Sequence, residues 1–289
     1  MNIKFYAAAI AILLLTASCN QRGTTNKSAA TSRQDTTAPV VQPINTTYRY
    51  LTDKDSIKKL EREYGAQLGI ILSVNRTDTQ HIAKMDTVLI PADLSADVAR
   101  YSPFPQSIPY ANIRKVIYFS YPAQYFAAYQ NGQLVRSGPT NMGRKKDPTP
   151  TGLFFTNWKG ESVKSTSNDE WILKWNFNVI NDSGIGFHQY DLPGYPASHS
   201  CLRLQMDDAK YLYTFADEWK LQGKQHVVAK GTPVIIFGEY PFGGRKPWLQ
   251  LAENPHASEI SVADIKQLTD PHVEEILAAQ RGRDSVGAH

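Results

Sequence analysis

Six short runs rich in β-branched and aromatic residues lie between residues 114 and 240, and this succession constrains the fold most strongly. Runs of this composition are typical of β-strands. They are KVIYFSY, QYFAAYQ, QLVRSGPT, TGLFFTNWK, WILKWNFNVI and GTPVIIFG. The pair Asn131-Gly132 separates the second run from the third and indicates a tight two-residue hairpin. The sequence therefore predicts a mainly β domain over residues 106–240.

One prominent helix is predicted inside this β domain. Its apolar face comprises Ala209, Leu212, Phe215, Ala216 and Trp219. This spacing is helical, with Asp207 as the expected N-cap and Gly223 as the stop.

The first nineteen residues predict export. MNIKFYAAAIAILLLTASC has one positive charge, an apolar stretch and small residues before Cys19. The apolar stretch is too short to span a bilayer, which favours a secretory signal. Small residues before a cysteine resemble a lipoprotein processing site, so Cys19 is the expected lipidation site, and an ordinary signal peptide is the alternative. Residues 20–47 are rich in Thr, Ser, Ala and Gln, which is typical of a flexible tether.

Composition places the chain among ordinary globular proteins. The 289 residues are 42% hydrophobic and 20% charged, with a formal net charge of +4. No run of Lys or Arg is long enough to form a nucleic-acid-binding arm, so no nucleic-acid partner is expected.

Residues 48–92 are predicted to form a small α+β module. SIKKLEREYG has helical spacing, with Asp55 or Ser56 as cap and Gly65 as stop, and MDTVLIP reads as a strand. The stretch resembles the LysM peptidoglycan-binding module in its order of strand, helices and strand, with Asn75 where that family favours Asn. It departs from LysM at the turn 52–55 and at Asp86, and any small α+β module fits the same apolar spacing.

Two segments flank the predicted domains. Residues 93–105 form a proline-punctuated linker, and residues 241–289 form a polar tail. In the tail, Ser261 and Asp264 predict a capping box, and Asp270-Pro271 predicts a second helix start.

The segment FHQYDLPGYPASHSCLRL contains the most reactive side chains. If Cys19 carries lipid, Cys201 is the only thiol left, and an exported protein usually pairs its cysteines or lacks them. A thiol that transfers acyl groups needs a histidine to accept its proton. His199 lies beside Cys201, and His188 lies thirteen positions upstream. Cys201 is thus a candidate nucleophile, and a buried free thiol is the plain alternative.

The residues Ser198-His199-Ser200-Cys201-Leu202-Arg203-Leu204, preceded by His188, resemble the signature of the L,D-transpeptidase catalytic family (the YkuD-type domain). Thr149-Pro150-Thr151-Gly152 resembles the turn of that family before a strand, and GTPVIIFG resembles its closing strand. The resemblance covers roughly residues 111–238. It implies an L,D-transpeptidase-like β-sandwich or barrel.

The resemblance also implies roles. Cys201 is the nucleophile, His188 the general base, and His199 a residue that positions substrate or serves as the alternative base. The backbone N–H groups of residues 199–201, Ser200 among them, are the oxyanion donors. Gln189 replaces a residue that is often Gly or Ser, so a backbone carbonyl is expected to orient the imidazole.

Further expectations concern the same loop. Ser198 is expected to make a local hydrogen bond, and Arg203 to meet a substrate carboxylate or brace the loop through backbone carbonyls. Ser200 stands where the family has Gly, so we expect a turn without a conformation reserved for Gly. The interval between His188 and Cys201 is short for the family and predicts a trimmed loop. Trp171, Trp175 and Tyr190 are expected to line a substrate groove or to belong to the core.

The implied reaction is attack of Cys201 on a peptidoglycan stem tetrapeptide, release of D-Ala and a 3→3 cross-link. Water or a protein amine as acceptor gives L,D-carboxypeptidase or anchoring activity. Other readings are a papain-like peptidase, a zinc site of His188, His199 and Cys201, and an inactive wall-binding lipoprotein. The expected partners are stem peptides, glycan strands and a membrane through the lipid anchor, in the periplasm or cell envelope. No cofactor and no metal is expected.

Overall fold

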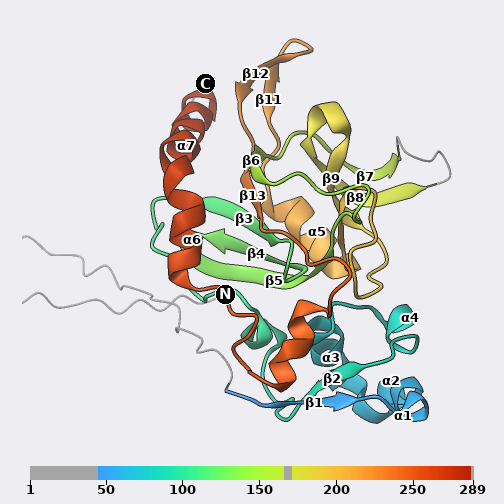
Figure 1. Ribbon diagram of the computed structural model, residues 1–289. Helices are drawn as coiled ribbons and strands as arrows, with labels where there is room; N and C mark the ends of the chain where they lie inside the picture. Colours follow the sequence, from blue (N-terminus) through green and yellow to red (C-terminus); the bar gives the residue numbers. More distant parts are fainter. Residues whose placement is uncertain (1–44, 166–170, 288–289) are drawn as a thin grey trace, which may run out of the picture. The chain divides into compact units, whose positions relative to one another are not determined.

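The computed structural model describes residues 45–165 and 171–287 (Figure 1). The predicted signal peptide, Cys19 and nearly all of the predicted tether lie outside these residues. No helix in the described ranges is both long enough and apolar enough to cross a membrane.

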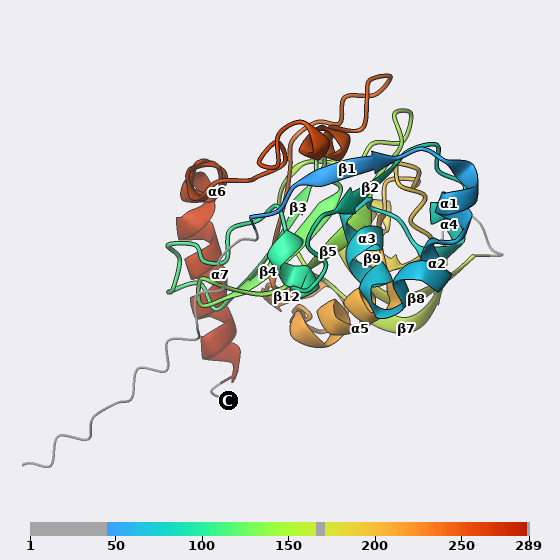
Figure 2. The same cartoon turned by 90° about the horizontal axis from the view of Figure 1, so that it is seen from below.

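Residues 48–92, here called the N-terminal module, contain two antiparallel strands with short helices between them (Figure 2). The elements are β1 (Tyr48–Leu51), α1 (Lys54–Lys58), α2 (Leu60–Tyr64), η1 (Gly65–Gln67), α3 (Leu68–Val74), α4 (Thr79–Ile82) and β2 (Val88–Pro91). Their apolar side chains form a small core of their own, with Leu60, Ile71 and Val88 at its centre. The cap of α1 is Asp53, whose Oδ2 accepts the Ser56 N–H at 2.8 Å, so the prediction of Asp55 or Ser56 was wrong.

The rest of the chain is built on one curled nine-stranded sheet with the strand order β6-β13-β3-β4-β5-β10-β9-β8-β7. The strands are β3 (Lys115–Ser120), β4 (Tyr125–Gln130), β5 (Gln133–Asn141), β6 (Gly152–Phe155), β7 (Lys159–Lys164), β8 (Ile172–Ile180), β9 (Ile185–Gln189), β10 (Leu202–Leu204) and β13 (Pro233–Phe237). All six predicted runs therefore contain strands. Asn131 and Gly132 have φ values of 50° and 77°, the left-handed pair that a tight hairpin turn requires.

The neighbouring strands β9 and β10 run parallel, although most strand pairs in the sheet are antiparallel. Their register places Arg203 opposite His188 and Leu202 opposite Phe187. Cys201, one residue before β10, therefore lies beside the start of β9. This pairing therefore brings Cys201 close to His188, which lies thirteen positions earlier in the sequence.

A single helix, α5 (Met206–Phe215), packs on the core beside β8 and β9. It is shorter than predicted. Its N-cap is Gln205, with no side-chain cap, and Asp207 lies in its first turn. The chain leaves the helix at Ala216 because Asp217 bonds to two other segments: its N–H donates to Thr232 Oγ1 at 2.9 Å and its carbonyl accepts from Thr156 Oγ1 at 2.6 Å. The following residues form the hairpin β11 (Lys220–Gln222) and β12 (His226–Ala229), and so Trp219 and Gly223 lie outside the helix.

The helical end of the C-terminal tail packs on the face of the sheet opposite α5. The tail contains η4 (Pro247–Ala252), α6 (Val262–Thr269), η5 (Asp270–His272) and α7 (Val273–Gly287). The predicted capping box of Ser261 and Asp264 is confirmed at the start of α6. Ile265 and Ile276 are fully or almost fully buried in the cluster of β3 and β4 side chains.

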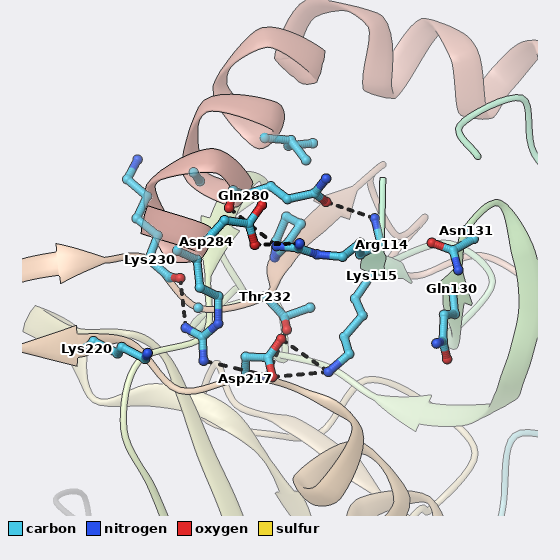
Figure 3. A pocket seen from close by; sticks show the side chains of 15 residues that line it. Arg114, Lys115, Gln130, Asn131, Asp217, Lys220, Lys230, Thr232, Gln280 and Asp284 are labelled. Carbon is cyan, nitrogen blue, oxygen red and sulfur yellow. Dashed lines mark hydrogen bonds and ion pairs between the residues drawn. The ribbon is translucent and has the colours of Figure 1, made fainter. Parts of the chain in front are cut away.

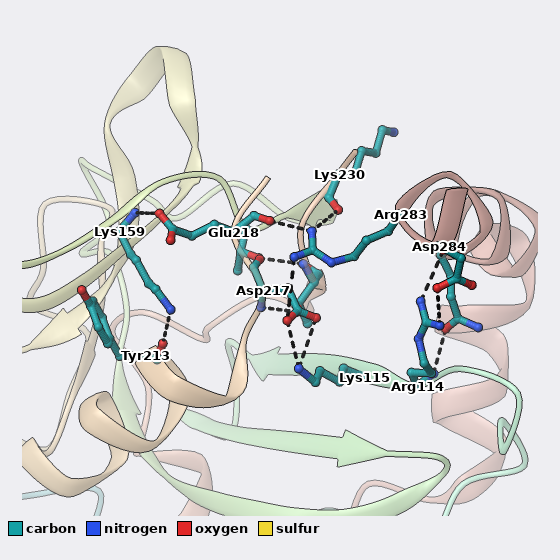
Figure 4. A network of polar contacts seen from close by, with 12 residues as sticks. Arg114, Lys115, Lys159, Tyr213, Asp217, Glu218, Lys230, Arg283 and Asp284 are labelled. Atoms are coloured by element: carbon teal, nitrogen blue, oxygen red, sulfur yellow. Dashed lines mark hydrogen bonds and ion pairs between the residues drawn. The ribbon is translucent and has the colours of Figure 1, made fainter. Parts of the chain in front are cut away.

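Charged side chains fasten α7 beside a hollow of about 610 Å³ at the edge of the sheet (Figure 3). Arg114 pairs with Asp284 at 2.6 Å and Lys115 with Asp217 at 3.1 Å. Arg283 lies 3.9 Å from Asp217 and donates to the Glu218 carbonyl at 2.6 Å (Figure 4). These charged side chains already pair with other parts of the protein. We therefore interpret the hollow as the contact between the tail and the sheet, and not as a ligand site.

Arg76 joins the module, the sheet and the tail. Its side chain is buried and donates to the carbonyl of Ala123 at 2.8 Å, and it lies over the rings of Tyr125 and Trp248. Its other hydrogen bonds go to carbonyls at the end of α3. Burial lowers the pKa of the guanidinium to about 10. A buried cation held by carbonyls and ring faces requires all three parts of the chain to be in place.

Candidate active site

Cys201 and His188 line the same small cavity, of about 30 Å³, at the ends of the parallel strands β9 and β10. A cavity of this size holds about one water molecule. Its other lining residues are Ser165, Trp171, Leu173, Tyr190, Ser198, His199 and Arg203. The structure thus brings together the candidate nucleophile and both candidate bases.

The imidazole of His188 is buried and oriented by its own strand. Its Nδ1 lies 3.0 Å from the Gln189 carbonyl, in agreement with the expected backbone contact. A carbonyl can only accept, so Nδ1 carries the proton and Nε2 is left as the acceptor. Burial lowers the pKa of His188 to about 4, while the Gln189 carbonyl raises it and the positive charge of Arg203 lowers it further. The imidazole is therefore neutral at pH 7.

Cys201 is a free thiol that is partly exposed as a residue. Burial of its sulfur raises the pKa of the thiol, and the backbone of Gly186 and the charge of Arg203 act in the opposite direction. The thiol and the imidazole are thus both neutral at rest, and no hydrogen bond joins them among the described atoms. A neutral pair of this kind forms its thiolate only as the proton moves to the histidine.

The turn before Cys201 is tied to the loop after β5. Ser198 Oγ donates to the Cys201 carbonyl at 2.5 Å, the local hydrogen bond expected for this residue. Thr149 Oγ1 donates to the Ser200 carbonyl at 2.8 Å and accepts the Gly143 N–H at 2.9 Å. The turn at Thr149 and the turn before Cys201, about fifty residues apart in sequence, are therefore joined by hydrogen bonds.

Ser200 has a φ of 74°, in the left-handed region. This turn uses a conformation that Gly favours but that Ser can also adopt, so it is not one open only to Gly. Ser200 is held there by its carbonyl bond to Thr149 and by its Oγ, which donates to the Asp147 carbonyl at 3.2 Å. A residue other than Gly in this region costs about 1 kcal/mol or more, so the turn is strained.

His199 is exposed, and its ring meets Trp171 edge-to-face at 5.4 Å. Partial burial, followed by the charge of Arg144, lowers the pKa of His199. The N–H groups of His199 and Ser200 donate to no other residue in the described part of the chain. They are available as hydrogen-bond donors beside Cys201.

Arg203 points its guanidinium at the face of Tyr190, 4.5 Å from the ring centroid. Burial lowers the pKa of Arg203, while the nearby charges of Tyr190 and Asp191 raise it; within the described ranges no carboxylate lies within 4 Å of the guanidinium and no hydrogen bond of it is seen. The bracing of the loop through backbone carbonyls is therefore not seen. A half-buried cation on the cavity wall is suited to a carboxylate ligand.

The aromatic residues divide between the two expected places. Trp171 and Tyr190 line the cavity, with their ring centroids 6.1 Å apart. Trp175 instead packs against Tyr213 at the core, at 5.3 Å. Its φ of 54° lies in a bulge of β8, which reverses the alternation of side chains, so Trp175 packs at the core while Trp171 lines the cavity.

Two glycines of the site were missed by sequence analysis. A Cβ at Gly186 would lie 2.3 Å from the Phe177 carbonyl, and one at Gly143 would lie 2.2 Å from the Asp147 carbonyl. Gly186 lets β9 approach β8 beside Cys201, and Gly143 lets the Thr149 turn close. A glycine inside a strand pattern was the signal for Gly186.

The zinc alternative gains no support from the geometry. In the residues that the structure describes, no group of three or more His, Cys, Asp or Glu side chains is arranged to hold a metal ion.

The region that forms the sheet matches a known protein family. Residues 114–236 match the family described as the L,D-transpeptidase catalytic domain (YkuD). No match was found among curated proteins.

Solved structures similar to this chain include an L,D-transpeptidase from Stackebrandtia nassauensis, at 21% identity over 65% of this chain and 79% of that one, with a TM-score of 0.39. Those from Mycobacterium smegmatis (22% identity, TM-score 0.34) and Mycobacterium tuberculosis (21%, 0.35) align over 43% of this chain. The aligned region spans 59% and 58% of these mycobacterial chains, less than two thirds of their length.

Proposed function

Because residues 114–236 form an L,D-transpeptidase catalytic domain of the YkuD family, we propose that Cys201 of this protein carries out acyl transfer on peptidoglycan stem tetrapeptides. The observation that carries the proposal is the shared cavity of Cys201 and His188, in which Nδ1 is held by the Gln189 carbonyl and Nε2 is free to accept a proton.

In the first half-reaction, Cys201 Sγ attacks the carbonyl carbon of the third stem residue while its proton passes to His188 Nε2. The N–H groups of His199, Ser200 and Cys201 stabilise the oxyanion of the tetrahedral intermediate. When the intermediate collapses, the bond to D-Ala breaks and the imidazolium returns its proton to the leaving amine. The products are free D-Ala and a thioester on Cys201.

In the second half-reaction, the side-chain amine of a neighbouring stem attacks the thioester. His188 accepts the proton that the amine loses, and that proton returns to Sγ as the sulfur leaves. The product is a 3→3 cross-link and the thiol is regenerated. Water in place of the amine gives a carboxypeptidase, and a protein amine gives an anchoring enzyme.

Arg203 supplies the basis for substrate recognition. Its guanidinium lies on the cavity wall over Tyr190, and no carboxylate of the described chain forms an ion pair with it within 4 Å, although the charge of Asp191 is near. We assign it to a carboxylate of the stem peptide. Exposed His199 and half-buried Trp171 line the same cavity, and we assign both to contacts with the peptide near the thioester.

The proposal extends to the cell envelope through the segments before and around the domain. Lipid on Cys19 would tether the enzyme to a membrane, residues 20–47 would give it reach, and a LysM-like module would hold glycan strands. The family match begins at residue 114 and leaves these assignments as predictions.

The test is the intact mass of the protein after incubation with purified disaccharide-tetrapeptide, with Cys201→Ala as the inactive variant and His226→Gln as an exposed-histidine control. An acyl adduct that requires Cys201, with D-Ala release and dimeric muropeptides, supports cross-linking. D-Ala release without dimers supports the carboxypeptidase. A folded protein with no adduct and no D-Ala release would contradict the proposal and favour the inactive wall-binding lipoprotein.

A further inference from the structure

The loop between the two strands of the site is held by the N-terminal module. The Leu192 N–H donates to Asp78 Oδ2 at 2.6 Å, and the Leu192 carbonyl accepts from Thr77 Oγ1 at 3.0 Å and from the Asp78 N–H at 3.2 Å. Thr77 also forms an isolated β-bridge with Pro193. Thr77 and Leu192 are completely buried, so water does not compete for these hydrogen bonds.

Asp78 connects this loop to a helix of the module. Its Oδ1 accepts the N–H groups of Gln80 and His81, each at 3.0 Å, and lies 2.7 Å from His81 Nδ1. One carboxylate therefore caps α4 and holds Leu192 at the same time. Arg76, two residues before Asp78, is bonded to the turn between β3 and β4, so the module cannot shift without breaking buried contacts.

Two residues before Leu192, Tyr190 forms the part of the loop that meets the site. Its N–H donates to the Leu204 carbonyl at 3.1 Å. Its ring lies 6.1 Å from the His188 ring at 80°, and it carries the Arg203 guanidinium on its face. The short connection to Leu192 makes the position of this ring depend on the anchor at Thr77 and Asp78.

We propose that Asp78 and Thr77 are positioning residues for the active site, which act through Leu192 and Tyr190 on His188 and Arg203. The module is then part of the catalytic unit and contributes to turnover independently of any glycan it binds. The expected effect on substrate binding rests on the proposed function. The expected effect on alkylation of the Cys201 thiol does not.

The variants Asp78→Ala and Thr77→Val remove the two sides of the anchor. Thr77→Val keeps the shape of the side chain and is the milder change. Asp53→Ala is the matched control, because Asp53 caps another helix of the same module and contacts no residue of the site. All variants are compared below the onset of their thermal unfolding.

The first measurement is the pH dependence of Cys201 alkylation by iodoacetamide, followed at that residue by peptide mass spectrometry. The titratable and charged groups that line the cavity with His188 are Cys201, His199, Arg203 and Tyr190. Release of the loop admits water to the cavity and relieves the burial that raises the thiol pKa, so the alkylation profile is expected to move to lower pH by about one unit in both anchor variants. Asp53→Ala is expected to keep the wild-type profile.

The second measurement is the steady-state rate with disaccharide-tetrapeptide. We expect KM to rise about tenfold in the anchor variants, with a smaller change in kcat, since Arg203 loses its support. The proposal is overturned if both anchor variants match Asp53→Ala in the alkylation profile and in KM. If the wild-type protein shows no turnover, the proposed function fails, while the alkylation profiles still decide whether the module positions the site.

Discussion

Thr149 Oγ1 donates a hydrogen bond of 2.8 Å to the carbonyl of Ser200, the residue before the proposed nucleophile. The same hydroxyl accepts the Gly143 N–H. Thr149→Val keeps the volume and leaves both backbone groups unpaired, at a cost of about 1–3 kcal/mol each if they stay buried. We expect the rate of Cys201 acylation to fall at least tenfold, and Thr149→Ser to restore most of it, as measured by intact mass over time.

The left-handed φ of Ser200 predicts that Ser200→Gly stabilises the fold. Glycine adopts this conformation without the Cβ penalty, so the free energy of unfolding should rise by about 1 kcal/mol, reduced by the loss of the weak bond to Asp147. Urea unfolding measures the change. Ser200→Val should destabilise, since a β-branched side chain fits this region worst. A less stable Ser200→Gly would show that the Oγ contact outweighs the strain.

Stability should depend on pH through His188. Its pKa is about 4 in the folded protein and near 6.5 in an unfolded chain, so the unfolded state binds more protons between these values. The stabilisation is complete above pH 6.5 and is lost as the pH falls toward 4, by on the order of 3 kcal/mol. Urea unfolding at several pH values should show this loss in the wild-type protein and not in His188→Gln. Parallel curves for the two proteins would contradict the buried neutral imidazole.

Arg203 should affect substrate binding more than chemistry. Replacing it with Met removes the charge over Tyr190, and we expect KM for a stem peptide to rise about tenfold with a smaller fall in kcat. A stem peptide with its carboxylates amidated is the matched probe. It should bind the wild type as weakly as the natural peptide binds Arg203→Met. If amidation has no effect, Arg203 serves the loop alone.

Lipidation can be tested apart from catalysis. Cys19→Ala should shift the protein from the membrane fraction to the soluble fraction and abolish labelling by a radioactive or clickable fatty acid. The thiol chemistry of Cys201 should remain unchanged. Membrane association that survives the substitution would favour the ordinary signal peptide or another anchor.

The strands were predictable because β-branched and aromatic residues concentrate in them, and Asn131-Gly132 marked the hairpin. The end of α5 was not, since the apolar spacing continues to Trp219 while Asp217 bonds to Thr232 and Thr156. Helical periodicity describes one face of a segment. It carries no information about hydrogen bonds to residues far away in the sequence, which end the helix here. The opposite placement of Trp171 and Trp175 was not predictable for a related reason, because a bulge in β8 changes the alternation without a clear mark in the sequence.

The residue types of the site could be read from the sequence, but their arrangement could not. Cys201 and His188 drew attention through their chemistry, whereas the parallel register of β9 and β10 that joins them has no local signal. The contact of Asp78 with Leu192 spans 114 positions. Two short polar residues in an apolar module have no feature that would connect them to a loop so far away.

The buried guanidinium of Arg76 has a consequence for the order of events during synthesis. The chain emerges from its N-terminus, so Arg76 is made long before Trp248, which covers it. Until Trp248 has been made, the guanidinium of Arg76 is not fully enclosed. The neighbouring residues Thr77 and Asp78 are then not held in their final positions. We expect the thiol to acquire its finished surroundings only after Trp248 has been made, so a chain interrupted before that residue would carry Cys201 in an incomplete site.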